Sequence, residues 1–201
     1  MTNCIVAASR GGSTYGDYSI RCMGYSSTSA TYHGYIYSTI SSAPSFMELV
    51  NCTIADGKRY GAAALGDNTE LHLKNCISYG HSVSGVVNAT SIEYSCIQEE
   101  HEGEGNFVPE SVEALNWTGA PYYHLLTKHS NGAITNGWFS GTFESAKTAA
   151  DSPCIDAGAP KSVGLDLEPE PHGKRVNLGA YGGTQWASMT SGSIGLILVV
   201  K

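Results

Sequence analysis

Short runs of alternating apolar and polar residues mark the middle of the chain. Leucine alternates with histidine and lysine in residues 71–74, and Val, Cys and Ile alternate with Asn and Thr in residues 50–54. A period of two places alternate side chains on opposite faces of a strand. The pattern therefore predicts β-strands with one buried face, and long amphipathic helical stretches are nearly absent.

Several of these runs resemble one another, which indicates an internal repeat. Cys52 and Cys76 are 24 residues apart, Cys76 and Cys96 are 20 apart, and Cys4 and Cys52 are 48 apart, which would fit two repeats of 24. Such a period is typical of solenoids, whose repeats stack on one another. We expect stacked strands with ladders of like residues. The related segments are Leu49–Ile54, Leu73–Ile77, Ile92–Ile97 and Thr2–Ile5.

Asparagine and cysteine have structural interpretations in such a stack. Asn51 and Asn75 each precede a cysteine, and Asn tolerates the positive φ of a corner. The six cysteines contain no CxxC pair, so we interpret most of them as small buried apolar residues. A Cys96–Cys154 disulfide stays open. Cys22 breaks the period, so the first forty residues are expected to hold a longer loop or an irregular coil.

Changes in composition divide the chain into three parts. The acidic stretch 99–106 interrupts the repeats, so we place the regular coils in residues 1–107. Residues 108–190 are irregular and rich in aromatics, and we expect them to cap the exposed end of the stack. Residues 191–201 form an apolar tail that is predicted either to add one more strand or to mediate self-association.

The C-terminal third carries the most specific motifs. Ser152-Pro-Cys-Ile-Asp-Ala-Gly158 and, further on, Arg175-Val-Asn-Leu-Gly-Ala-Tyr-Gly-Gly183 resemble the closing region of bacterial surface proteins with the pectate-lyase-like β-helix fold. The resemblance extends over roughly residues 48–188. It implies an all-β fold, a right-handed single-stranded parallel β-helix with an irregular C-terminal cap, and export to the cell surface or medium. It implies no single shared activity.

Charge and hydropathy exclude two classes of partner. The formal net charge is −7 and the 11 Lys and Arg residues are scattered, whereas nucleic-acid binding needs clustered positive charge. The longest apolar run, residues 194–200, is too short to span a bilayer. The chain starts directly in a predicted strand without a leader, so we expect the C-terminal portion of a longer exported protein.

The best lyase-like group of residues is Asp56, Lys58 and Arg59. A polysaccharide lyase needs a cation or Arg to neutralise the uronate and a base within reach of the proton that it removes. A solvated loop explains the same three residues. No pair of carboxylates stands out for glycoside hydrolysis.

Aromatic residues in the N-terminal part suggest a binding role. Tyr32, Tyr35 and Tyr37 belong to a tyrosine-rich stretch, and aromatic faces stack on sugar rings. Half-buried strand positions explain these tyrosines equally. Arg175 is a candidate for binding a carboxylate of a uronate, with a salt bridge inside the cap as the alternative.

Acidic residues provide candidate calcium ligands. Asp166 and Glu168 are the candidate metal site, because Ca²⁺ takes oxygen ligands; no other cofactor is expected. Asp156 is either a ligand or acid, or an acceptor of backbone hydrogen bonds in a turn. The stretch 99–104 is the other acidic candidate, with a solvated loop as its alternative.

The sequence thus favours a structural or glycan-binding portion of an exported bacterial surface protein, without catalysis in this chain. The alternative is a polysaccharide lyase or glycoside hydrolase that acts on a plant- or algal-type polysaccharide.

Overall fold

The computed structural model describes residues 5–7, 36–38, 45–57, 60–64, 69–118, 123–128 and 150–190. These residues form an all-β structure of parallel strands, with two 3₁₀ helices and no α-helix among them. The strands are β1 (Ile5–Ala7), β2 (Ile36–Ser38), β3 (Ser45–Val50), β4 (Thr53–Ala55), β5 (Tyr60–Ala64), β6 (Thr69–Lys74), β7 (Ile77–Tyr79), β8 (Ser84–Val87), β9 (Ser91–Glu93) and β10 (Cys96–Ile97); the 3₁₀ helices are η1 (Glu113–Leu115) and η2 (Leu165–Leu167).

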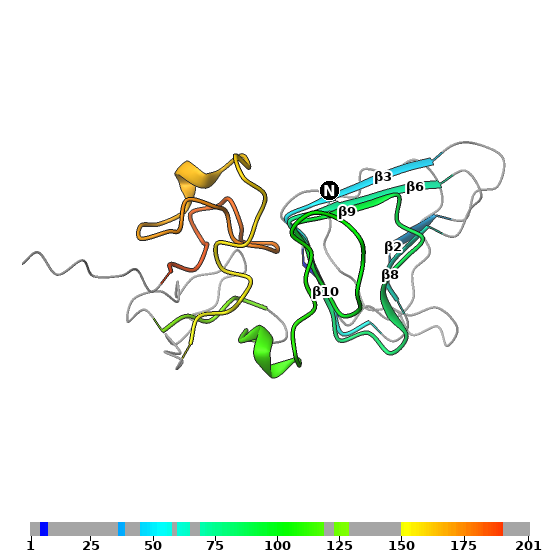
Figure 1. The fold of residues 1–201 in the computed structure, drawn as a ribbon, viewed down its shortest axis with the longest axis horizontal. Coiled ribbons are helices and arrows are strands. Elements are labelled where there is room, and N and C mark those ends of the chain that lie inside the picture. The colour runs from blue at the N-terminus through cyan, green and yellow to red at the C-terminus, as the bar shows by residue number, and fades with distance from the viewer. Residues whose placement is uncertain are drawn as a thin grey trace, which may run out of the picture.

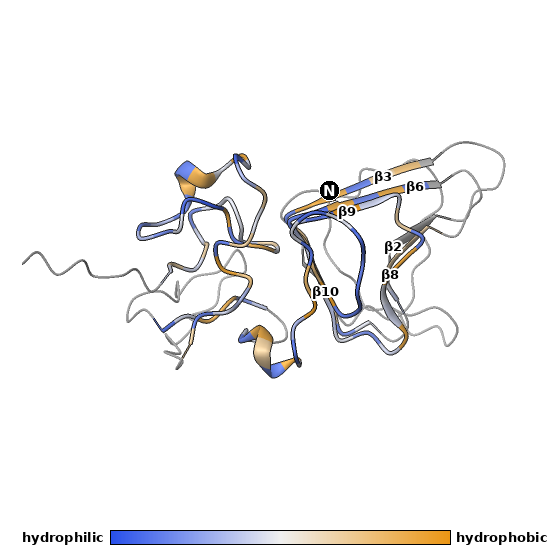
Figure 2. Ribbon diagram, viewed as in Figure 1, coloured by the Kyte–Doolittle hydropathy of each residue, from blue (hydrophilic) through white to orange (hydrophobic). Residues whose placement is uncertain are grey.

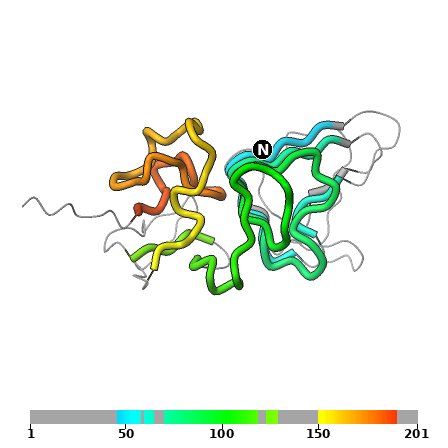
Figure 3. Tube along the Cα trace, in the orientation of Figure 1, coloured from blue at the N-terminus to red at the C-terminus, as the bar shows by residue number. Residues whose placement is uncertain are grey.

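The strands form three parallel sheets with the orders β1-β4-β7-β10, β2-β5-β8 and β3-β6-β9. Each strand is followed along the chain by a strand of another sheet, and every third strand returns to the same sheet (Figure 1). Successive repeats consequently follow nearly the same path, as the tube in Figure 3 shows. The fold therefore places residues from successive repeats next to one another on each sheet.

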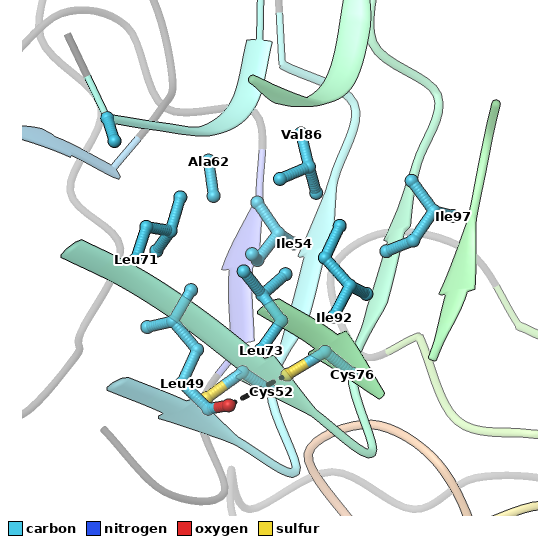
Figure 4. Close-up of a cluster of buried hydrophobic side chains, with 11 residues drawn as sticks. Leu49, Cys52, Ile54, Ala62, Leu71, Leu73, Cys76, Val86, Ile92 and Ile97 are labelled. Carbon is cyan, nitrogen blue, oxygen red and sulfur yellow. Dashed lines mark hydrogen bonds between the residues drawn. The ribbon is translucent and has the colours of Figure 1, made fainter. Parts of the chain in front are cut away.

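One apolar core lies between the three sheets. It contains inward-facing side chains from all of them, among them Leu49 and Leu73 of one sheet, Ile54 of the second and Ala62 of the third (Figure 4). Figure 2 shows apolar positions alternating with polar ones along β3 and β6. Burial of this apolar surface is the main favourable contribution to folding.

The corner residues behave as the sequence predicts, with one correction. Asn51 and Asn75 have φ angles of 49° and 53°, so both turn the chain in the left-handed region that Asn tolerates. The turn at Asn51 breaks the alternation expected through residues 50–54. Leu49, not Val50, points into the core together with Cys52 and Ile54.

The register of the repeats differs from the spacing of the cysteines in two places. β1 pairs directly with β4 (Ile5 with Thr53), so the 48-residue separation is one repeat, not two. Cys96 pairs with Ile77 and is therefore one position beyond the Cys52–Cys76 ladder. Because a shift of one residue exchanges the two faces of a strand, Cys96 leaves the inner core and joins a second apolar cluster.

That second cluster lies on the outer side of the β1-β4-β7-β10 sheet. Ile77 and Cys96 of the sheet contact apolar residues of the C-terminal region, namely Leu115, Leu125, Cys154, Ile155 and Leu178. Residues 108–190 were expected to cap an end of the stack. The described part of this region instead lies beside the stack (Figure 1), because the sheet presents apolar side chains outward as well as inward.

Hydrogen bonds attach the C-terminal region to successive repeats. The Ala180 N–H donates to Thr53 Oγ1 over 3.0 Å, and the Ala159 N–H donates to Asn75 Oδ1 over 2.7 Å. The Asn51 side-chain amide donates to the Gly182 carbonyl over 2.7 Å. The asparagine at each corner thus turns the chain and also holds the region that covers the sheet.

The acidic segment 99–107 lies against the last repeat. The Phe107 N–H donates to the Ser95 carbonyl, and the Ile97 N–H donates to the Phe107 carbonyl. The Asn106 side-chain amide donates to the Ile92 carbonyl over 2.7 Å. The segment therefore satisfies main-chain groups of β9 and β10, and most of its residues are hydrophilic (Figure 2).

Candidate functional site

The outward side of the β3-β6-β9 sheet is a polar strip with one exposed aromatic side chain. The register brings Glu48 beside His72 and His72 beside Ser91. We call this strip the β3–β6–β9 face and define it by its outward residues: Phe46, Glu48, Glu70, His72, Lys74, Ser91 and Glu93. Neighbouring strands are about 4.8 Å apart, so three repeats contribute to one continuous surface.

An aromatic pair lies at one edge of this face. The rings of Phe46 and His72 have centroids 5.1 Å apart at an interplanar angle of 34°, and Phe46 is 58% exposed. His72 Nδ1 is hydrogen-bonded to Ser91 Oγ over 2.8 Å, and its Nε2 lies 3.5 Å from Glu70 Oε2. Stacking on His72 therefore holds the apolar Phe46 ring in water, beside the polar side chains of Ser91 and Glu70 that contact His72.

Charged side chains complete the face. Lys74 Nζ lies 3.5 Å from Glu93 Oε2, and both side chains are about half exposed. Glu48 and Glu70 are exposed on adjacent strands. An exposed ring next to carboxylates, a hydroxyl and an ammonium group suits a sugar, which offers an apolar ring face and a rim of hydroxyls. Phe46, Glu48 and His72 were not predicted as a group from the sequence, although their alternation with Met47, Leu49 and Leu73 indicated that they share the outward side of the strands.

A cavity of about 590 Å³ lies at the last repeat, lined by Ile97, Glu99, Glu100, His101, Glu102, Asn106, Phe107 and Val108. Glu99 accepts hydrogen bonds there from the Gly85 and Val86 N–H groups and contacts His101 Nε2 over 3.0 Å. Burial opposes ionisation of Glu99, but the hydrogen bonds that it accepts prevail and lower its pKa. Its carboxylate is thus used by the fold, which weakens the hypothesis of calcium in the stretch 99–104.

A Ser–His pair inside the stack has a structural role. The Gly57 N–H donates to His81 Nδ1 over 3.0 Å, so the neutral ring carries its proton on Nε2, which faces Ser78 Oγ at 3.1 Å. Burial lowers the pKa of His81 to about 4. The imidazole therefore cannot take a proton from Ser78, whose hydroxyl donates to the Gly85 carbonyl.

The structure assigns Asp56 a contact that the sequence did not suggest. Asp56 lies at a corner with φ of 54°, and its Oδ2 accepts a hydrogen bond of 2.5 Å from the Tyr123 hydroxyl. Lys58 and Arg59 lie outside the described residues, so the lyase-like group stays a prediction. Tyr32 and Tyr35 also lie outside them, and for Tyr37 only the main chain in β2 is described.

Arg175 holds a turn. Its Nε donates to the Gly158 carbonyl over 2.5 Å and its Nη2 donates to the Ala157 carbonyl over 2.7 Å. The guanidinium lies 5.4 Å from the centre of the Tyr94 ring. Through these two carbonyls and the ring, Arg175 attaches the Ile155-Asp-Ala-Gly158 segment to the last repeat; no salt bridge of Arg175, the alternative considered from the sequence, is formed among the described residues.

The structure separates the two residues of the expected metal site. Asp166 is exposed in η2, whereas Glu168 is 5% exposed. Glu168 Oε1 accepts hydrogen bonds from the N–H groups of Asn177 and Gly183, at 2.8 and 2.7 Å. Burial, together with the charge of Asp156, raises the pKa of Glu168 to about 7 despite these bonds. The neighbouring acid of Glu168 is thus Asp156, not Asp166.

The four described cysteines are buried free thiols, as the sequence analysis expected for most cysteines. Cys52 and Cys76 lie side by side in the inner core (Figure 4). A hydrogen bond with the Cys154 thiol and burial raise the pKa of the Cys96 thiol, so Cys96 stays protonated and unreactive. Cys4 and Cys22 lie outside the described residues.

In the described ranges, no group of three or more His, Cys, Asp or Glu side chains is placed to hold a metal ion. No helix in that part of the chain is long and apolar enough to cross a membrane. Comparisons of the chain with protein-family models, curated proteins and solved structures gave no match.

Proposed function

We propose that this chain is a portion of a right-handed parallel β-helix from an exported bacterial surface protein, and that it binds glycan without catalysis. The cyclic order of strands among three parallel sheets supports the β-helix. The closing motifs around Asp156 and Asn177 support the surface-protein origin through their resemblance to that group. Export and handedness are part of the proposal.

The observation that carries the binding role is the β3–β6–β9 face. Phe46 is 58% exposed although it stacks on His72, so the free part of its ring can stack on a sugar. Beside Phe46, the three adjacent strands β3, β6 and β9 carry side chains that can form hydrogen bonds, such as Glu48, His72 and Ser91. A linear polysaccharide lying across the strands would contact polar side chains from each of the three repeats.

The test is a binding assay by calorimetry on neutral and uronic-acid polysaccharides, with Phe46→Ala and His72→Ala variants. We expect saturable binding to at least one polysaccharide, weakened about tenfold by Phe46→Ala, which corresponds to about 1.4 kcal/mol. The matched control is Val163→Ala, since Val163 is 94% exposed and lies in the C-terminal region. Failure of the whole panel to bind would refute the glycan-binding role.

The same panel tests the alternative activity. Reducing ends and unsaturated uronates are measured after incubation with each polysaccharide, with and without calcium. Absence of turnover is expected. Turnover that is lost in Glu48→Gln or Glu70→Gln would replace the proposal with a polysaccharide lyase or glycoside hydrolase acting at this face, since both carboxylates lie on it.

A further inference from the structure

Asp156 and Glu168 both hold a buried carboxylate oxygen without a partner. Asp156 Oδ1 and Glu168 Oε2 are shielded from solvent and accept no hydrogen bond from the described residues. Neither carboxylate forms an ion pair with any Lys, Arg or His in the described ranges. A buried carboxylate oxygen without a donor or cation is costly, so a ligand or a proton is expected there.

Asn177 is bonded to both of the residues that carry these carboxylates. The Asn177 N–H donates to Glu168 Oε1, and the Asn177 side-chain oxygen accepts from the Asp156 N–H over 2.8 Å. A second donor, the Gly183 N–H, fixes Glu168 Oε1 over 2.7 Å. Glu168 Oε1 is therefore occupied, and Oε2 is the oxygen left to bind something else.

Gly173 lies close against the Asp156 carboxylate. A Cβ at Gly173 would lie 2.5 Å from Asp156 Oδ2, so only glycine leaves this carboxylate its position. Asp156 is partly exposed, whereas Glu168 is 5% exposed. The Asp156 side chain therefore lies nearer the surface than that of Glu168.

We propose that Asp156 Oδ1 and Glu168 Oε2 bind one Ca²⁺ ion. Both ligands are carboxylate oxygens, which a hard cation prefers, and Ca²⁺ accepts water and main-chain carbonyls in irregular geometry to complete its shell. One ion neutralises two like charges that otherwise repel each other. This site differs from the pair Asp166 and Glu168 that the sequence suggested, and it does not depend on glycan binding.

The ion would join two segments of the C-terminal region that are also bonded to Asn177. Asp156 belongs to one closing motif, Glu168 follows η2, and Asn177 belongs to the second motif. Because Ala180 and Gly182 of the same region are bonded to Thr53 and Asn51 of the stack, calcium would stabilise the cover of the β1-β4-β7-β10 sheet.

The experiment is a calorimetric Ca²⁺ titration and thermal unfolding of the chelator-treated protein at about pH 8, where Glu168 is ionised. We expect one site with a Kd of about 10⁻⁴–10⁻³ M, the range of extracellular calcium modules, and a Tm that rises with Ca²⁺ concentration. Binding should weaken at pH 6, because protons compete for the same oxygens.

Three variants make the result specific. Glu168→Gln and Asp156→Asn keep the side-chain shape, and they should fold but lose the Ca²⁺-dependent rise in Tm. The control Asp166→Asn removes an exposed carboxylate two residues away and should keep it. The proposal is overturned by absence of saturable binding to the wild type at about 10 mM Ca²⁺, or by unchanged binding in both carboxylate variants. In that event a proton and water satisfy the two oxygens.

Discussion

The hydroxyl of Tyr123 donates a hydrogen bond of 2.5 Å to the carboxylate of Asp56, which lies 67 residues earlier in the chain. Tyr123 is 1% exposed, and its ring meets Trp117 edge to face with centroids 5.1 Å apart. Burial and the Asp56 carboxylate raise the pKa of the Tyr123 hydroxyl. The contact thus joins a corner of the strand stack to the C-terminal region.

Tyr123→Phe should destabilise the protein by about 0.5–1.5 kcal/mol, because it removes the hydrogen bond to Asp56, whose side chain is exposed, while the ring packing is kept. Urea unfolding at neutral pH measures the change. Asp56→Asn keeps an acceptor for the Tyr123 hydroxyl and should lose less stability than Tyr123→Phe. Equal stability of Tyr123→Phe and wild type would show that solvent satisfies Asp56 equally well.

His81 makes the protein sensitive to acid. Its pKa is lowered to about 4 by burial, whereas an unfolded chain protonates His near 6.5. The unfolded state therefore binds more protons in this window. The contribution of neutral His81 to the free energy of unfolding is complete above pH 6.5 and is lost as the pH falls toward 4. This contribution reaches about 3 kcal/mol at most.

The measurement is the free energy of unfolding against pH for wild type and His81→Asn. The variant should be less stable at pH 7, since the Gly57 N–H and Ser78 hydroxyl lose their partner. Its stability should vary less between pH 6.5 and 4 than that of the wild type. An unchanged pH slope in the variant would contradict the assignment.

Glu168 produces a slope of opposite sign. Its pKa rises from 4.5 to about 7 on folding, so the folded state binds more protons between these values. Without calcium, the contribution of protonated Glu168 to the free energy of unfolding is present below pH 4.5 and is lost as the pH rises through 7. Glu168→Gln should remove this loss, so its stability should decline less than that of the wild type from pH 5 to 8 in a chelator. A decline as large as that of the wild type would show that Glu168 titrates normally.

Gly179 sets the distance between the C-terminal region and the sheet. It has φ of 82°, and a Cβ there would lie 2.5 Å from Thr53 Oγ1 and 2.9 Å from Ile77 Cδ1. Gly179→Ala should therefore destabilise the protein by about 2–4 kcal/mol through overlap and backbone strain. Thermal unfolding measures the loss.

Thr53→Ala is the companion variant for Gly179→Ala. Alone it removes the hydrogen bond that Thr53 Oγ1 accepts from the Ala180 N–H. Because it also removes the atom that the new methyl meets, the double variant should lose less stability than the two single losses together. Strict additivity would show that contact with Thr53 does not cause the destabilisation.

Local patterns predicted much of the strand structure. The alternation of Leu71 and Leu73 with polar residues placed the leucines in the core, and Asn51 and Asn75 do adopt the positive φ expected of corners. These features are local, because side-chain alternation and φ preference belong to a few consecutive residues. The spacing of the cysteines was less reliable, since repeats of different length moved Cys96 out of the ladder.

The candidate sites depended on contacts that no local pattern contains. Arg175 was expected to pair with an acid, but the fold placed two carbonyls within its reach. Glu168 was grouped with Asp166 because they are two residues apart, whereas in the fold its carboxylate accepts hydrogen bonds from the main chain of Asn177 and Gly183. Proximity in the chain does not decide proximity in space when the segment has no regular periodicity.

The sequence by itself determined the parallel strands, their buried faces and the asparagine corners, because alternation and turn preference act over a few residues. Only the tertiary structure decided that Phe46, Glu48, Glu70 and His72 share one face, and that the C-terminal region covers the side of the stack. Both depend on register, where one residue exchanges the faces of a strand. They also depend on which surface remains apolar after the sheets have formed their common core.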